Sequence, residues 1–432
     1  MRLCESRVTV NWLRRLAVDT TPLQVPAFKR LFLGTVVTVL GTQMTLVTVP
    51  VQAYLLTGSS LIVGVTSIVA LVPLVIFGLL GGAIADAVDR RLLLLVTSAG
   101  AALTAIGLFL QSLLPGGGSL WLLWILVFFQ SACFAVNAPT RSATIPALVG
   151  LRRTPAANAL NMTVTQAGII GAPLLAGLLI GAGDLPLTYA VDAVGLLIAL
   201  PLLRGLPPLL PGGGGGRINL LGAIRSVGEG FTFLRTQPVL LMTFVVDIIA
   251  MVFGFPRAVL PELADTTFAG SSNALGWLFA AMSIGAVVAG VLSGPVARVH
   301  RQGAVILVAI AVWGIAVALF GVTTSLFWAV FFLALSGAAD MVSAVLRTSI
   351  LQSGAPDVMR GRMQGVFIVV VAGGPRLGDL RAGAMAAAVS VPVTMVSGGL
   401  LIVVAMVVVA IVVPTFWRYR FSSGGRESPT TG

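Results

Sequence analysis

Ionisable side chains inside long apolar runs are the residues of this chain with the most informative chemistry. Asp247 and Asp340 each interrupt an apolar run, and Arg376, Asp379 and Arg381 lie close together in a third. A charge in hydrocarbon is costly and is tolerated where it is paired or faces a water-filled cavity. Burial also makes a carboxylate a better proton acceptor. All five are therefore candidates for coupling or for the substrate cavity, and Asp247 and Asp340 are plausible partners for a proton or a cationic substrate.

Arg376 and Asp379 are three residues apart, so they would share one face of a helix. Two interpretations stay open. In the first, a structural ion pair lowers the cost of burying either charge, and both charges can be neutralised together without loss. In the second, protonation of Asp379 releases an arginine and biases the protein toward one conformation, so Asp379→Asn alone abolishes coupling.

Uncharged polar side chains could complete a cavity beside these charges. Gln43 lies in the first apolar run, and Gln130 and Asn137 lie in the fourth. They can hydrogen-bond a small molecule, or they can hydrogen-bond one helix to another, where such bonds average only about 0.6 kcal/mol. We favour the helix-to-helix interpretation for most of them.

The chain lacks the residue patterns of a metal site or a nucleotide-driven pump. It has one histidine, no paired-cysteine motif and no G-x-x-x-x-G-K-[ST] phosphate loop. One histidine cannot build a multi-histidine zinc site, and the missing loop excludes a Walker-type ATP site. We therefore expect no metal, no cofactor and no catalytic residue.

The elements that must hold these side chains follow from the composition. Hydrophobic residues make up 57% of the 432 positions and charged residues 9%, and the mean hydropathy is +1.05. No soluble core could bury so much apolar surface, so the solvent is lipid. One crossing of ~30 Å of hydrocarbon takes about 20 helical residues. We predict an all-α membrane protein with twelve transmembrane helices, at 31–54, 61–84, 92–114, 120–140, 158–182, 187–203, 239–260, 274–296, 303–322, 326–346, 364–388 and 393–414.

The placement of the basic residues predicts the orientation. If the N-terminus is cytoplasmic, all but three of the 26 Lys and Arg residues fall on the cytoplasmic side. This is the positive-inside bias, and it predicts that both termini are cytoplasmic. The net charge of +12 then reflects topology and contact with anionic lipid rather than nucleic acid binding.

A proline and glycine cluster, LPPLLPGGGGGR, divides the chain between the sixth and seventh predicted helices. An amphipathic helix is expected after it, along the inner membrane surface. The predicted organisation is a cytoplasmic N-terminal segment, a six-helix bundle, a cytoplasmic linker with this helix, a second six-helix bundle and a cytoplasmic tail. These parts span 1–30, 31–203, 204–238, 239–414 and 415–432.

Residues that recur after about 200 positions indicate that the two halves are related in parallel. The offsets are 202 to 208, and they pair Gly82 with Gly290, Arg90 with Arg298, Arg141 with Arg347 and Pro173 with Pro375.

The segment GGAIADAVDRRLL joins the second and third predicted helices. It carries Gly82, Asp86, Arg90 and Arg91. A carboxylate and guanidiniums at helix ends can form a charge-assisted latch suited to a gate, or they can simply anchor the inner membrane face. The spacing resembles the G-x-x-x-D-R-x-G-R-R/K signature of the major facilitator superfamily. Ala87 and Asp89 replace the usual Arg and Gly, so we expect an altered latch.

The fifth predicted helix carries a glycine and proline array at Gly168, Gly171, Pro173 and Gly177. It allows close packing and a kink at the proline. It resembles the antiporter-associated signature of the same superfamily and implies a hinge, although glycine-rich membrane helices are also common without this role.

The resemblance extends over nearly the whole chain. The segments VPVQAYLLTGSSLIVG, PALVG, VLPELAD and RTSILQSGAPDVMRGRMQG resemble the superfamily branch of enterobactin-exporter and macrolide-efflux type. It implies two six-helix bundles and a central cavity lined by helices 1, 4, 7 and 10, which would include Asp247 and Asp340. It also implies export from the cytoplasm by proton antiport.

We therefore expect an efflux transporter for a siderophore or drug-like compound in a bacterial inner membrane. Its partners are a small-molecule substrate, protons and the lipid bilayer, with no nucleic acid; the oligomeric state stays open, and a monomer is favoured. A proton-coupled importer or facilitator is the alternative. An integral membrane enzyme is a remote one, because the predicted outer loops are very short.

Overall fold

The computed structural model describes residues 19–209, 220–269, 273–292, 299–354 and 360–420, and the described part is almost entirely helical. Eleven of its helices are long and apolar enough to cross a membrane. The twelfth predicted span corresponds to α14 (Arg360–Ala388), a helix of 29 residues that carries Arg376, Asp379 and Arg381. The prediction of an all-α membrane protein with twelve long helices is confirmed.

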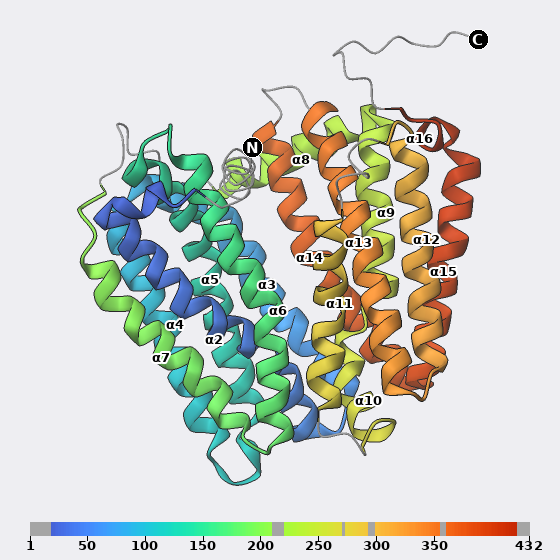
Figure 1. The fold of residues 1–432 in the computed structure, drawn as a ribbon, viewed down its shortest axis with the longest axis horizontal. Coiled ribbons are helices and arrows are strands. Elements are labelled where there is room, and N and C mark those ends of the chain that lie inside the picture. Colours follow the sequence, from blue (N-terminus) through green and yellow to red (C-terminus); the bar gives the residue numbers. More distant parts are fainter. Residues whose placement is uncertain (1–18, 210–219, 270–272, 293–298, 355–359, 421–432) are drawn as a thin grey trace, which may run out of the picture.

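The first bundle contains six helices, which stand together on the left of Figure 1. They are α2 (Pro26–Thr57), α3 (Ser60–Ala87), α4 (Arg90–Ser112), α5 (Leu120–Val149), α6 (Thr154–Gly181) and α7 (Leu185–Arg204). Their ends follow ordinary capping chemistry. Proline begins α2, Asp89 and Asp184 accept backbone N–H groups at the starts of α4 and α7, and Gly58 ends α2 with a φ of 62°.

The second bundle contains the other six long helices, on the right of Figure 1. They are α9 (Pro238–Gly254), α11 (Ala274–Val291), α12 (Gln302–Val322), α13 (Leu326–Gly354), α14 and α15 (Val391–Val412). The short elements η3 (Arg257–Val259) and α10 (Leu260–Thr266) follow α9, and α16 (Pro414–Trp417) follows α15.

The predicted amphipathic helix is present as α8 (Leu220–Thr236), which packs on α14 and α9. It lies at the face of the molecule where α2 begins and α15 ends, which we call the terminal face (Figure 1). The opposite face, which carries α10, is the distal face. Leu234 of α8 is buried and Phe231 is 42% exposed, as expected for a helix with one apolar side.

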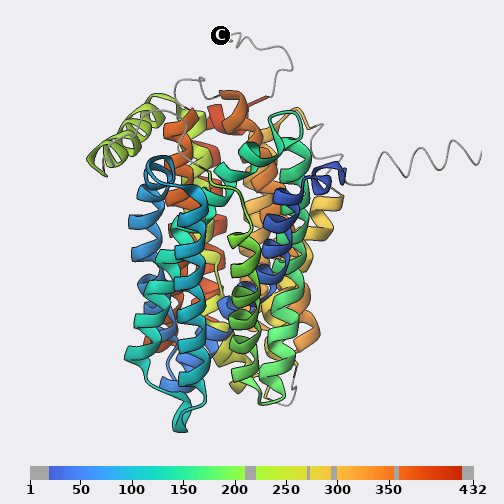
Figure 2. The same ribbon diagram turned by 90° about the vertical axis from the view of Figure 1, so that its left-hand side faces the viewer.

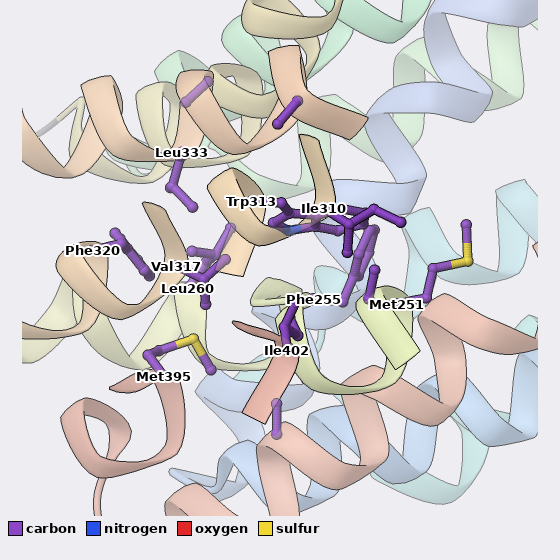
Figure 3. Packing of buried hydrophobic residues seen from close by; sticks show 14 of the residues in the cluster. Met251, Phe255, Leu260, Ile310, Trp313, Val317, Phe320, Leu333, Met395 and Ile402 are labelled. Carbon is purple, nitrogen blue, oxygen red and sulfur yellow. The ribbon is translucent and has the colours of Figure 1, made fainter. Parts of the chain in front are cut away.

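The core of the second bundle is a continuous apolar cluster around Trp313 (Figure 3). Trp313 of α12 is fully buried, and Gly254 of α9 leaves room for its indole ring. Helices α12 and α15 touch backbone to backbone where Gly314 faces Gly399. Because lipid tails are as apolar as leucine, close packing through such small residues is what holds membrane helices together.

The two bundles join mainly through α3 with α14 and through α6 with α11. In the first contact, a Cβ on Gly64 would lie 2.7 Å from the Asp379 carbonyl oxygen, and in the second, a Cβ on Gly177 would collide with the backbone of Gly276. These residues lie in the distal halves of their helices. Figure 1 shows the bundles side by side at this end, and Figure 2 views the molecule from the side of the first bundle.

Gly177→Val should therefore force the distal ends of the bundles apart, since the new side chain would occupy the α11 backbone. In a cysteine-free background with spin labels at the exposed residues Leu55 and Val389, pulsed electron paramagnetic resonance should show longer and broader distances. Gly171→Val is the matched control, because a Cβ at Gly171 has nothing within 4 Å. Unchanged distances in Gly177→Val would contradict the close packing of α6 on α11 at the distal end of the bundles.

Candidate functional site

A polar cavity of about 460 Å³ lies inside the first bundle. Residues of α2, α4, α5, α6 and α7 line it, and Gln43, Gln130 and Asn137 are all among them. Asn137 also donates hydrogen bonds to the hydroxyls of Thr97 and Ser98 on α4, at 2.8 and 3.1 Å. The three polar residues identified in the sequence thus converge on one cavity, and Asn137 joins helices as well.

Arg141 of α5 lines the same cavity. Its guanidinium donates to the hydroxyl of Thr35 and, at 3.5 Å, to the carbonyl of Leu31, both on α2. Within the part of the chain that the structure describes, it forms no ion pair with a carboxylate. The cavity wall therefore carries a positive charge held by neutral groups.

Asp192 of α7 is a buried carboxylate behind the cavity wall, and it was missed among the candidate charges. Its side chain is fully buried and accepts hydrogen bonds from Thr45 at 2.7 Å, Thr42 at 3.2 Å and Gln130 at 3.1 Å. Thr42 and Gln130 also line the cavity, so Asp192 shares its donors with any occupant. The sequence could have identified it, because Asp192 is an ionisable residue inside the predicted span 187–203.

Asp247 and Asp340 share an arginine in the second bundle. Arg347 of α13 forms an ion pair with Asp247 of α9 and places a guanidinium nitrogen 3.5 Å from Asp340 Oδ1. The Asp247 and Arg347 side chains are 7% and 10% exposed, whereas that of Asp340 is 32% exposed. The sequence suggested a cationic ligand for these two carboxylates, and in this structure the cation beside them is Arg347.

The ion pair that the spacing of Arg376 and Asp379 suggested is not formed. Arg376 donates to the carbonyl of Ala372 at 2.8 Å, and Asp379 accepts a hydrogen bond of 2.9 Å from Ser67 of α3. The carboxylate points across the interface between the bundles, so sharing a helix face with Arg376 does not bring the charges into contact. Arg376 and Arg257 still act on Asp379 electrostatically.

Arg381 is satisfied inside the second bundle. It donates to the carbonyl of Phe253 at 3.2 Å, and its guanidinium lies 5.2 Å from the centroid of the Phe253 ring. This cation-π contact and hydrogen bond fix α14 to α9. Arg381 therefore serves packing in this state rather than pairing with Asp379.

The segment between α3 and α4 ties the terminal face of the first bundle together. Arg90 donates to the carbonyl of Ala143 on α5 at 3.1 Å, and Arg91 donates to that of Arg204 on α7 at 2.6 Å. Asp89, which replaces the glycine of the superfamily signature, caps α4. The side chain of Asp86 and the position Gly82 lie outside the described residues, so the predicted latch stays a prediction.

The glycine and proline array of α6 is divided between two contacts. Gly168 faces Val39 and Gln43 of α2, and Gly177 faces α11 across the interface. Pro173 is buried within the helix. The array provides close packing on both sides of α6, and its role as a hinge stays a prediction.

A larger depression of about 670 Å³ lies between α4 and α7 at the terminal face. Five of its lining residues are apolar or small, and its polar part consists of Asp89, Arg91 and Arg204. Asp89 is already engaged in the helix cap, and Arg91 donates to the backbone carbonyl of Arg204 in the contact between α4 and α7. The smaller cavity is the candidate site, because polar side chains of four helices converge on it, and a concave site with convergent polar groups is typical of ligand binding.

Two bundles of six helices, with a polar cavity and ionisable groups at their core, define a multi-pass membrane transporter of the major facilitator type. Residues 17–422 match the MFS_3 family, described as transmembrane secretion effector, and the chain belongs to that family. It is a transporter and not an enzyme.

Named relatives and solved structures agree with this assignment. The enterobactin exporter EntS of Shigella dysenteriae serotype 1 is 29% identical over 93% of this chain and 95% of its own length. EntS of Escherichia coli O81 is 27% identical over 95% and 96%. The crystal structure of the nucleoside transporter NupG is similar with a TM-score of 0.72 at 14% identity, covering 91% of this chain and 99% of NupG. A bacterial homologue of the lysosomal transporter Spinster, in an inward-facing conformation, has a TM-score of 0.64 at 15% identity, covering 91% and 99%.

Asp247→Asn should destabilise the protein by about 3–5 kcal/mol, because it leaves Arg347 buried without its closest counter-charge. The double variant Asp247→Asn with Arg347→Gln should recover much of this loss, since no buried charge is then unpaired. The thermal unfolding midpoint of the detergent-solubilised protein measures both effects. A double variant no more stable than the single one would argue against the pair.

Proposed function

We propose that this transporter exports a small siderophore-like or drug-like molecule from the cytoplasm by proton antiport with alternating access. The enterobactin exporters that it resembles along nearly their whole length support export and this size of cargo. The family description as a secretion effector supports the same direction.

The terminal face is proposed to be cytoplasmic. Arg90, Arg91, Arg152, Arg153 and Arg204 lie at helix ends or turns of this face, in agreement with the positive-inside bias of the whole chain. Both bundles would then begin and end in the cytoplasm, and α8 would lie along the inner membrane surface. The membrane is proposed to be a bacterial inner membrane.

The contacts between the bundles support an inward-facing state. Among the described residues, two side-chain hydrogen bonds join the bundles, Ser60 to Glu262 and Ser67 to Asp379, and both lie in the distal half. The cavity extends to Asn158 of α6 and Ile145 of α5, in the terminal half of the first bundle. With the distal end joined, the cytoplasmic side is the side from which a substrate would enter.

One observation supports proton coupling: two side chains that donate hydrogen bonds to Asp192, Gln130 and Thr42, also line the cavity. While Asp192 is ionised, the amide of Gln130 and the hydroxyl of Thr42 donate to it. A proton on one carboxyl oxygen of Asp192 turns that oxygen into a donor. The partner of that oxygen, Thr42 on Oδ1 or Gln130 on Oδ2, must then change the group that it presents to the cavity. A substrate bound to Gln130 and Thr42 therefore favours one protonation state, and this linkage is the requirement for exchange.

Asp379 is a second candidate for coupling, as its position in α14 suggested. It joins the bundles through Ser67 where α3 and α14 touch. A change in its charge would alter its attraction to Arg257 and Arg376 at the distal joint. In this role it would bias the equilibrium between the two conformations without touching the substrate.

Asp192→Asn is expected to abolish proton-driven accumulation of external enterobactin by inside-out vesicles, and to retain counterflow of labelled substrate. Counterflow needs binding and conformational exchange but no proton movement. If Asp379 acts only through the contact between α3 and α14, Asp379→Asn should slow both proton-driven accumulation and counterflow.

Asp265→Asn, at an exposed carboxylate of α10, is the matched control and should resemble wild type. Full proton-driven accumulation by Asp192→Asn would remove Asp192 from coupling. Accumulation only in right-side-out vesicles would support an importer and contradict the proposed export.

A further inference from the structure

We propose that Arg141 makes the cavity of the first bundle a site for organic anions, so that the cargo carries a carboxylate, phenolate or similar oxygen anion. This inference rests on the proposed function, because it names the chemical class of the exported molecule. It concerns binding, and it can be tested without transport.

Arg141 carries the only charge among the residues that line the cavity, all of which the structure describes. A guanidinium has five N–H donors. Within the described residues, its hydrogen bonds to Thr35 and Leu31 both come from Nη1. Donors at Nε and Nη2 are thus left for an oxygen acceptor of a ligand.

The corresponding arginine of the second bundle shows what Arg141 lacks. Arg347 lies 206 positions later, near the same end of the equivalent helix, and is neutralised by Asp247 and Asp340. Asp340 stands seven residues before Arg347, and the residue seven before Arg141 is Phe134. The two bundles share the arginine, and only the second supplies it with carboxylates.

Asp192 does not replace the missing counter-charge. Its carboxylate accepts hydrogen bonds from Thr42, Thr45 and Gln130 and forms no ion pair with Arg141 in the described structure. A guanidinium removed from bulk water without a counter-charge is costly. An anionic cargo would supply this counter-charge, and a carboxylate could bind the guanidinium through two parallel hydrogen bonds.

The rest of the lining defines the neutral part of the cargo. Side-chain amides of Gln43, Gln130 and Asn161 offer donors and acceptors, and Val39 and Phe134 provide apolar wall. A volume of about 460 Å³ lies within the range of sites for drug-sized ligands. The matching molecule is a drug-sized anion with a hydroxyl-rich edge and an apolar or aromatic body.

Two xanthene dyes of similar shape and opposite charge test this inference. Equilibrium dialysis of the full-length protein in nanodiscs of neutral lipid measures binding of fluorescein, an anion, and rhodamine 123, a cation. The wild type should bind fluorescein roughly tenfold more tightly, the size expected for a charge-assisted hydrogen-bonded contact. Arg141→Gln should lose this preference, and Arg141→Lys should keep most of it.

Two further variants keep the test independent of folding effects. Asn137→Asp keeps Arg141 and adds a carboxylate one helical turn away, so it should also abolish the preference for fluorescein. Arg152→Gln removes an exposed arginine outside the cavity and should bind as the wild type does. Equal binding of both dyes by the wild type, or a preference that survives Arg141→Gln, overturns the inference.

These results separate the anion site from the proposed function. A wild-type protein that binds both dyes equally but shows proton-driven export would refute the anion site alone. An intact preference in a protein that shows no proton-driven export would refute the transport proposal alone.

Discussion

A side chain that keeps its charge inside the hydrocarbon layer must find a counter-charge, hydrogen bonds or water within the protein. In the second bundle this constraint ties α9 to two of its neighbours. Arg347 fixes α13 to α9 through Asp247, and Arg381 fixes α14 to α9 through the carbonyl and ring of Phe253. Asp379 extends the same rule to the first bundle through Ser67. Each of these polar contacts joins two helices that are separate along the chain.

Close packing makes these contacts possible, because hydrogen bonds between helices need backbones that approach one another. Gly64 brings α3 against α14 beside the contact between Ser67 and Asp379, and Gly177 does the same for α6 and α11. These contacts lie toward the distal face and leave the polar cavity in the first bundle. The bundles are thus joined at the distal end, and the cavity that we propose as the substrate site extends into the terminal half of the first bundle.

Most of the fold could be predicted from the length of the apolar runs. Lipid offers no hydrogen bonds to the backbone, so each run must satisfy its own amide groups as a helix. The offset of 206 between Arg141 and Arg347 correctly placed both arginines near the same end of equivalent helices. The family assignment agrees with the resemblance carried by the sequence segments.

The candidate site was predicted in part. Gln43, Gln130 and Asn137 were identified because polar residues in apolar runs are rare, and they line one cavity. Asp192 was overlooked although the same rule applies to it. The sequence by itself determined the residue types and their positions along each apolar helix, because composition and helical rise depend on one chain segment at a time. Only the tertiary structure decided the partners, such as Asp379 with Ser67, 312 positions away. Those partners depend on how each helix is rotated and which neighbour it faces, and helical periodicity carries no information about either.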